Sequence, residues 1–264
     1  MTRSTEAFIG SKWLCIILVI YASTWTLSES IPNSNAAKIS EVFRWKYIEF
    51  DYPSKSERQE AIDNGDFIPG RSLLIDVDVY YGSRGQKVFI GMPRMQGGHP
   101  ATIATVTNKT TADGNPIVKP YPSWDWHKNL NDCPTNRIVS VFRVKVDECG
   151  RLWILDTGSR NDSYICPAQI LAFDLKTDTL LYRYEIPSNQ YEPRSVFVVP
   201  VVDVRDKQCK DTIVYVSDCQ GFAIIVYNPS LGVSWKVGDK TMYPYPSSGT
   251  YEIQGKNTAI LFEC

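Results

Sequence analysis

Hydrophobic and polar residues alternate in short runs, and one such arrangement occurs three times along the chain of 264 residues. Each copy has a strand-like run with a central aromatic residue, Phe89, Trp153 or Tyr215, and these positions lie 64 and 62 residues apart. A second apolar run follows in each copy, at 101–106, 170–175 and 222–227. Alternation with a period of two predicts half-buried β-strands, and a repeat of this length fits one blade of a propeller.

The repeat predicts an all-β fold, a β-propeller of four-stranded blades. About three blades are expected, at about 72–120, 137–187 and 195–238. The second has predicted strands at 138–147, 151–156, 170–175 and 180–186. The third has predicted strands at 195–204, 212–218, 222–227 and 233–237. The first shows only three, at 72–80, 87–92 and 101–107. Because three blades do not close a propeller, we expect the chain to be incomplete.

Other segments have weaker patterns. An alternating strand is predicted at 43–50, and the only clear helical stretch is 54–63. Residues 116–134 are rich in proline and tryptophan and are interpreted as a linker between the first two blades. A short apolar segment at 251–253 is interpreted as the start of a further blade.

The N-terminus has the pattern of a secretory signal. Arg3 and Lys12 precede an apolar run at 13–21 that is too short to span a bilayer comfortably. We therefore predict a signal peptide at 1–30, an extracellular location, and a partial propeller domain at 31–264. The alternative is an uncleaved membrane anchor. A net charge of −1 gives no general attraction to nucleic acid or to an anionic membrane, so neither is expected as a partner. The oligomeric state is left open.

Secretion changes how the cysteines are interpreted. One cysteine lies in the predicted signal, and six remain: Cys133, Cys149, Cys166, Cys209, Cys219 and Cys264. An even number in a secreted chain suggests disulfides. Positions along the repeat favour two pairings, Cys133 with Cys166 and Cys149 with Cys209, the second only if the two turns approach within disulfide reach. Cys219 and Cys264 are left, and Cys264 is the strongest candidate for a cysteine whose partner lies in missing sequence.

Two sequons for N-glycosylation fit the same compartment, at Asn108 and Asn161. Both fall where loops are predicted, which favours their use. No Cys-x-x-Cys motif and no histidine cluster is present, so no metal ion and no other cofactor is expected.

Several longer motifs resemble one known family. They include Ile138 to Gly158, Ile170 to Leu175, Tyr182 to Pro187, Phe89 to Arg94 and Tyr215 to Asp218. Together they resemble the yellow/major royal jelly protein family of insects over roughly 43–235. The resemblance implies a secreted six-bladed β-propeller. It also implies that family members continue well beyond this chain, so we expect a C-terminal truncation.

Candidate chemistry centres on the two histidines, which alone titrate near neutrality without help. His99 lies in a glycine-rich turn beside Arg94, which could hold an anionic carboxylate. The alternative is that both residues simply bond backbone groups. His127 is interpreted as a surface loop residue. Aromatic residues in loops, Tyr121, Trp124, Trp126 and Tyr164, could stack on a ligand ring or cover packing between blades.

Aspartates at strand ends invite an acid or metal interpretation. Asp156 and Asp218 recur at the same position of the repeat, and such recurrence favours a structural role in accepting backbone N–H bonds. Asp76, Asp78 and Asp147 raise the same question without recurring.

The resemblance implies three function classes. The first is a non-catalytic secreted protein that binds a small aromatic amine or catechol, or acts in cuticle or egg pigmentation through the melanin pathway. The second is a dopachrome-converting isomerase of melanin synthesis, which would need a positioned acid or base. The third is a structural or nutritive protein. Since no acid–base constellation stands out in the sequence, the first is favoured.

Overall fold

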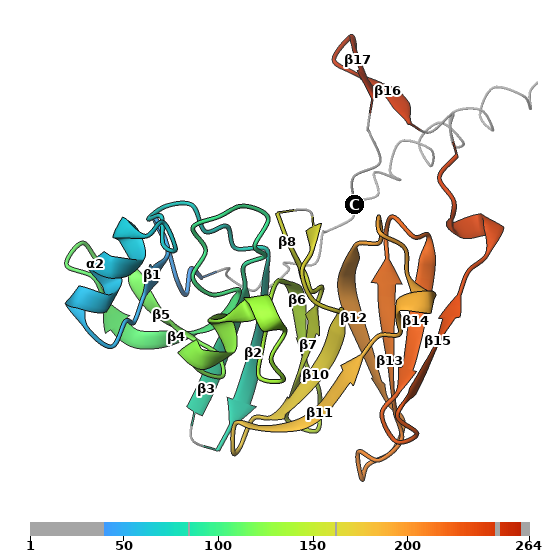
Figure 1. Cartoon of the computed structure of the whole chain (residues 1–264), viewed down its shortest axis with the longest axis horizontal. Coiled ribbons are helices and arrows are strands. Elements are labelled where there is room, and N and C mark those ends of the chain that lie inside the picture. Colours follow the sequence, from blue (N-terminus) through green and yellow to red (C-terminus); the bar gives the residue numbers. More distant parts are fainter. Residues whose placement is uncertain (1–39, 84, 162, 246–248, 260–264) are drawn as a thin grey trace, which may run out of the picture. The chain divides into compact units, whose positions relative to one another are not determined.

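Antiparallel β-sheet makes up most of the structure, a computed structural model that describes residues 40–83, 85–161, 163–245 and 249–259. The chain divides into two units, Met1–Val42 and Phe43–Cys264. The predicted signal peptide and Cys264 lie outside the described residues. All elements below belong to the second unit (Figure 1).

The first sheet has five strands in the order β1-β5-β4-β3-β2. Their bounds are β1 Glu49–Phe50, β2 Asp76–Gly82, β3 Gly85–Gly91, β4 Ile103–Thr110 and β5 Pro116–Pro120. The segment predicted as a linker therefore contains a strand, β5, which pairs with β4 on one side and in parallel with β1 on the other. Of the strand predicted at 43–50, only its last two residues are in β1.

The second and third sheets each have four antiparallel strands. The second has the order β11-β10-β7-β6, with β6 Val141–Val146, β7 Arg151–Asp156, β10 Gln169–Asp174 and β11 Thr179–Glu185. The third has the order β12-β13-β14-β15, with β12 Phe197–Val204, β13 Thr212–Asp218, β14 Ala223–Asn228 and β15 Val233–Val237. The predicted strands of these two sheets are confirmed, with small shifts at their ends.

Short elements complete the unit. Two hairpins are formed by β8 Ser159–Arg160 with β9 Ser163–Tyr164, and by β16 Thr250–Ile253 with β17 Lys256–Ala259. The helix α2, Lys55–Asp63, starts at Ser54, whose hydroxyl accepts the Glu57 N–H as an N-cap. Four short 3-10 helices are η1 Trp124–His127, η2 Leu130–Asp132, η3 Ser188–Gln190 and η4 Lys240–Met242. No helix in the described ranges is long and apolar enough to cross a membrane.

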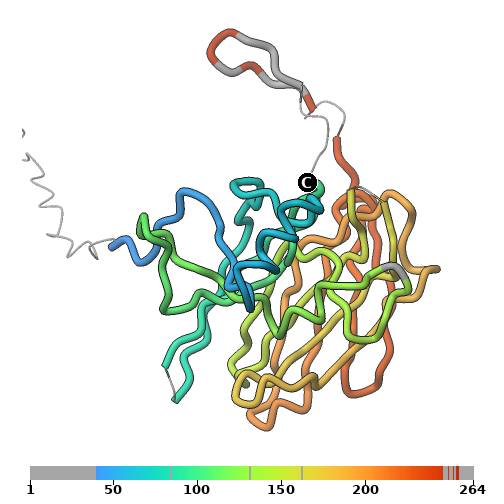
Figure 2. Tube along the Cα trace, turned by 60° about the vertical axis from the view of Figure 1, so that its left-hand side comes forward, coloured from blue at the N-terminus to red at the C-terminus, as the bar shows by residue number. Residues whose placement is uncertain are grey.

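The three sheets follow one another in chain order and pack face to face (Figures 1 and 2). Phe89 and Ile103 of the first sheet pack against Leu152 and Phe173 of the second. The opposite face of the second sheet, with Trp153 and Ile170, packs against the third, with Val214, Val216 and Ile225. The first strands β2, β6 and β12 are neighbours, since β6 contacts both of the others. Helix α2 covers the remaining face of the first sheet through Ala61 and Ile62.

Two disulfides reinforce these layers. Cys133 bonds to Cys166 with Cα atoms 5.6 Å apart, and Cys149 bonds to Cys209 with Cα atoms 6.1 Å apart. These are the two pairings that the positions of the cysteines suggested. The second joins the turn after β6 to the turn after β12, and so ties the second sheet to the third. Because disulfides persist in oxidising compartments, both fit an extracellular protein.

Candidate functional site

A cavity of about 450 Å³ lies beside α2. Its volume is within the range of sites for small molecules. Four parts of the chain form its walls: α2 with the residues around it, the loop after β3, the segment from η1 to η2, and β8. The lining residues are Tyr52, Glu57, Glu60, Ala61, Asn64, Asp66, Arg94, His99, Pro100, Trp124, His127, Lys128, Asn129, Leu130 and Arg160. Both sequence-predicted candidates, Arg94 and His99, are among them.

Arg94 is buried and holds the loops of the cavity together. Its five guanidinium N–H groups are directed at five backbone carbonyls: those of His99, Pro100, His127, Ile138 and Val139. Burial lowers the pKa of Arg94 to about 10, and the positive charge of Arg160 acts in the same direction. With every donor occupied, Arg94 has none left for a ligand carboxylate. The structural alternative for Arg94, bonding to backbone groups, is the one that the geometry supports.

His99 is buried beside Arg94, and its Nδ1 has no hydrogen-bond partner within the described chain. Burial is the main cause that lowers the pKa of His99 below its ordinary value. The positive charges of Arg94, Arg71 and Arg160 lower it further. The imidazole is therefore neutral at neutral pH, which is the state in which it can accept a proton.

His127 is not a surface residue, and the sequence interpretation was wrong. It ends η1 with only 4% of its surface exposed, and its Nε2 lies 2.9 Å from the Tyr121 carbonyl. Because a carbonyl only accepts, Nε2 carries the proton of the neutral ring. Burial, and then the charge of Arg94, lower the pKa of His127 to about 3. No periodic pattern marks a residue in a single 3-10 turn, so the sequence held no signal for this burial.

Aromatic rings form one wall of the cavity. Tyr52 and Trp124 are in contact, with ring centroids 4.6 Å apart, and the Lys128 ammonium lies 5.6 Å from the Trp124 ring. Trp124 lines the cavity while its indole N–H donates to the Asp51 carbonyl, so contact between this ring and a ligand stays a prediction. Tyr121 and Trp126 instead pack edge-on against Phe173 in the core.

The remaining candidate from that group, Tyr164, is also structural. Its hydroxyl donates to the carbonyl of Ser195, and its ring lies near that of Tyr191. For three of the four aromatic candidates, the structure therefore supports packing rather than contact with a ligand.

Unpaired polar atoms concentrate at the cavity. In the described part of the chain, five buried side-chain polar atoms lack a hydrogen-bond partner within the protein. Three belong to lining residues: Tyr52 Oη, His99 Nδ1 and His127 Nδ1. Buried polar groups are nearly always paired, so a cluster of exceptions in one cavity is typical of a place prepared for a polar partner.

The recurring aspartates are structural, as predicted. Asp156 Oδ1 accepts the N–H groups of Val139, Ser140 and Gly158, and its Oδ2 accepts from the Gln169 amide. Asp218 does the same in the next sheet, where it accepts from Val196, Gly221 and the Ser195 hydroxyl. Burial raises the pKa of Asp156 above its ordinary value, although these hydrogen bonds oppose the shift.

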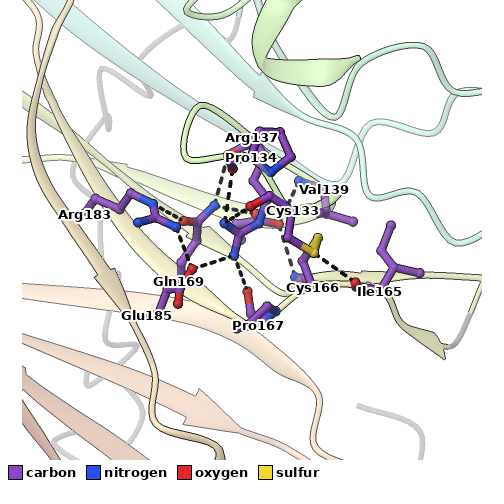
Figure 3. Close-up of polar contacts among 12 residues, drawn as sticks. Cys133, Pro134, Arg137, Val139, Ile165, Cys166, Pro167, Gln169, Arg183 and Glu185 are labelled. Atoms are coloured by element: carbon purple, nitrogen blue, oxygen red, sulfur yellow. Dashed lines mark hydrogen bonds and ion pairs between the residues drawn. A yellow bond between two sulfur atoms is a disulfide. The ribbon is translucent and has the colours of Figure 1, made fainter. Parts of the chain in front are cut away.

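Near Asp156, the guanidinium of Arg137 connects the two chain segments that the Cys133–Cys166 disulfide joins (Figure 3). It donates to the carbonyls of Cys133 and Pro134 on one side and of Pro167 on the other, and to Glu185. These hydrogen bonds fix the loop that follows η2.

The other aspartates also bond backbone. Asp76 and Asp78 on β2 accept the N–H groups of Val144 and Val146 on β6, and so join the first two sheets. Asp147 accepts from Arg151 and from the Trp153 indole. Among the described residues, no three histidine, cysteine or carboxylate side chains gather as a metal site requires.

The sequon residues are both exposed. Asn161 lies in the turn between β8 and β9, as a loop prediction requires, but the loop prediction for Asn108 was wrong, because this residue lies on strand β4. The Asn161 N–H donates to the Arg94 carbonyl, which places it next to the cavity. Cys219 has a free thiol and is half-buried, and burial raises its pKa. Whether the sequons carry glycans stays a prediction.

Stacked, mainly antiparallel sheets of four or five strands, with a cavity beside α2, define a mostly β protein with a site of small-molecule size. The family profile described as "Major royal jelly protein" matches residues 139–261. The dopaminechrome tautomerase of Drosophila melanogaster is 33% identical over 236 residues, which are 88% of this chain and 49% of the relative. The chain therefore belongs to the yellow/major royal jelly protein family.

Two further relatives agree. Protein yellow of Drosophila subobscura is 35% identical over 232 residues, which are 86% of this chain and 39% of the relative. Protein yellow of Drosophila melanogaster is 32% identical over 256 residues, which are 95% of this chain and 44% of the relative. The chain thus spans about half the length, or less, of the curated relatives that it matches.

Proposed function

We propose that this protein is a secreted yellow-family protein that binds a small aromatic amine or catechol in the cavity beside α2 and thereby takes part in pigmentation. One observation carries the proposal: three of the five unpaired buried polar atoms in the described chain belong to residues lining this one cavity. A catechol or amine offers polar hydrogens to such atoms, while Tyr52 and Trp124 offer aromatic surface to its ring.

Calorimetric titration tests this binding. Dopamine and serotonin should each give saturable heat with the wild-type protein. Trp124→Ala should lower the affinity for both ligands, because the aromatic ring of the ligand loses a contact surface. Trp126→Phe is the matched control, since Trp126 packs in the core outside the cavity. The absence of saturable heat with either ligand would contradict binding and leave a structural or nutritive role.

A second candidate is an isomerase that converts dopachrome or a related aminochrome. It is favoured by the neutral imidazole of His99 in the cavity, since a base must be unprotonated to accept a proton. One relative, the dopaminechrome tautomerase of Drosophila melanogaster, supports the same chemistry. In such a reaction His99 would remove a proton from the ring system, and Arg94 would position the loop that carries His99 through its bond to the His99 carbonyl.

The absorbance of dopachrome separates the two candidates. An isomerase removes the absorbance at a rate proportional to protein concentration, and His99→Ala abolishes the rate. If wild-type protein binds the ligand with no turnover, the enzyme hypothesis is wrong and the binding protein remains.

We also propose that the three sheets are blades of a β-propeller. Successive sheets pack face to face and their first strands β2, β6 and β12 are neighbours, as blades around an axis require. A crystal structure tests this directly: the three strands should run side by side around one axis, and a two-layer sandwich would contradict the proposal. Secretion is supported by the two disulfides and is tested by detecting the processed protein in culture medium.

A further inference from the structure

Two arginines line the cavity, and Arg160 is the one whose guanidinium donors are not occupied within the described chain. It lies on β8, lines the cavity and is half-buried. Within the described residues its guanidinium makes no hydrogen bond and no ion pair. Arg94 differs, because five carbonyls occupy all of its donors.

Other positive charges surround Arg160. Its charge acts on both Arg94 and His99, and Arg71 contributes at the same place. The charges of Asp156 and Asp66 oppose the effect of Arg160 on Arg94, but no carboxylate in the described chain pairs with the Arg160 guanidinium itself. A guanidinium in such a place favours an anion, and a carboxylate matches its paired N–H donors.

Acidic side chains also line the cavity. Glu57 and Glu60 on α2, with Asp66 just after it, line the cavity. The cavity lining therefore combines the Arg160 guanidinium on β8, carboxylates on and just after α2, and the aromatic rings of Tyr52 and Trp124. A zwitterion on an aromatic ring matches this distribution better than a simple amine does.

We propose that Arg160 determines specificity by binding the carboxylate of the ligand, which rests on the function proposed above. The cavity then prefers aromatic α-amino acids to the corresponding amines, which lack the carboxylate. The ammonium group is directed toward the acidic wall formed by α2. Arg160 thus takes the role that the sequence suggested for Arg94.

The test compares L-3,4-dihydroxyphenylalanine with dopamine, two catechols that differ by one carboxylate. Calorimetry on the full chain should show about tenfold tighter binding of the amino acid, a factor in the range of one charge-assisted hydrogen bond. Arg160→Gln should abolish this preference while leaving dopamine affinity nearly unchanged, and Arg160→Lys should retain part of it.

Arg71→Gln is the matched control. Arg71 also contributes positive charge near His99, but its guanidinium donates to the Gly97 carbonyl and does not line the cavity. This variant should keep most of the preference. Equal affinities for the two ligands in the wild-type protein, or an unchanged preference in Arg160→Gln, would overturn the role of Arg160 while binding stands. If neither ligand binds, both the proposed function and the proposed role of Arg160 are wrong.

Discussion

Two polar clusters in this protein share a buried setting and differ in how completely they are paired. Around Asp156, both carboxylate oxygens have partners, and the four groups that donate to them are fixed in return. Among the residues that line the cavity beside α2, three have a buried polar atom without a partner in the described part of the chain. The first pattern is typical of structural polar groups, and the second of a site for a ligand. Burial of a polar residue therefore says little about function until its partners are counted.

The largest effect is expected from Asp156→Ala. The N–H groups of Val139, Ser140 and Gly158 would be left buried without an acceptor, each at about 1–3 kcal/mol, so the free energy of unfolding should fall by about 4 kcal/mol. Urea denaturation measures it. Asp174→Ala is the control, because the hydrogen bond that this carboxylate accepts comes from the exposed Lys176 N–H. If both variants lose the same stability, the Asp156 cluster is not structurally special.

Arg94→Met should have the next largest effect. Five carbonyls lose their donor, and the loops that carry His99 and His127 lose their connection, so we expect about 3 kcal/mol lower stability and loss of ligand binding. Arg71→Met, at an exposed position with one carbonyl partner, should change stability by less than about 0.5 kcal/mol. A stable Arg94→Met variant that still binds ligand would show that the loops do not depend on this side chain.

Acidification should destabilise the protein through His127. Its pKa is about 3 in the folded state and about 6.5 when unfolded, so the unfolded chain takes up a proton that the folded chain refuses as pH falls below 6.5. The stabilisation is complete above pH 6.5 and should fall by about 2 kcal/mol between pH 6.5 and 5.

Urea denaturation across that pH range measures the slope, and His127→Gln should flatten it because glutamine does not titrate. The same slope in both proteins would mean that His127 is protonated within the fold.

The smallest effect, with the opposite sign, is expected from Tyr52→Phe. Removing a buried hydroxyl that has no partner should leave stability unchanged or raise it by up to about 1 kcal/mol, while ligand affinity falls. Tyr164→Phe is the matched control, because its hydroxyl donates to the Ser195 carbonyl, and it should lose about 1 kcal/mol. Loss of stability in Tyr52→Phe would show that its hydroxyl is paired after all.

Much of the fold could be predicted because short apolar runs rich in β-branched and aromatic residues mark the strands of the second and third sheets. In β7 and β13 these runs are almost continuously apolar and largely buried. The strand β5 was missed because Pro116 and Pro120 bound it, and proline normally argues against an inner strand. Here the prolines occupy the two ends of the strand, and the hydrogen bonds to β1 and β4 hold the segment in an extended conformation.

The site was predictable only in part. The glycine-rich turn indicated His99 and Arg94, which do lie together in the cavity. Which arginine is free for a ligand depends on carbonyls that come from segments more than forty residues away, such as Ile138 and Val139. Such long-range contacts leave no signal in the local sequence. The sequence around Arg160 therefore gave no indication that this residue lines the cavity.

The order of the two disulfides along the chain has a topological consequence. Cys149 lies between Cys133 and Cys166, and Cys166 lies between Cys149 and Cys209, so the two covalent loops are interleaved. A protease that cuts the backbone once, anywhere between the first and the last of these cysteines, leaves its two fragments joined by at least one sulfur bridge. Extracellular nicking in this region would change the pattern on a reducing gel without releasing a piece of the protein.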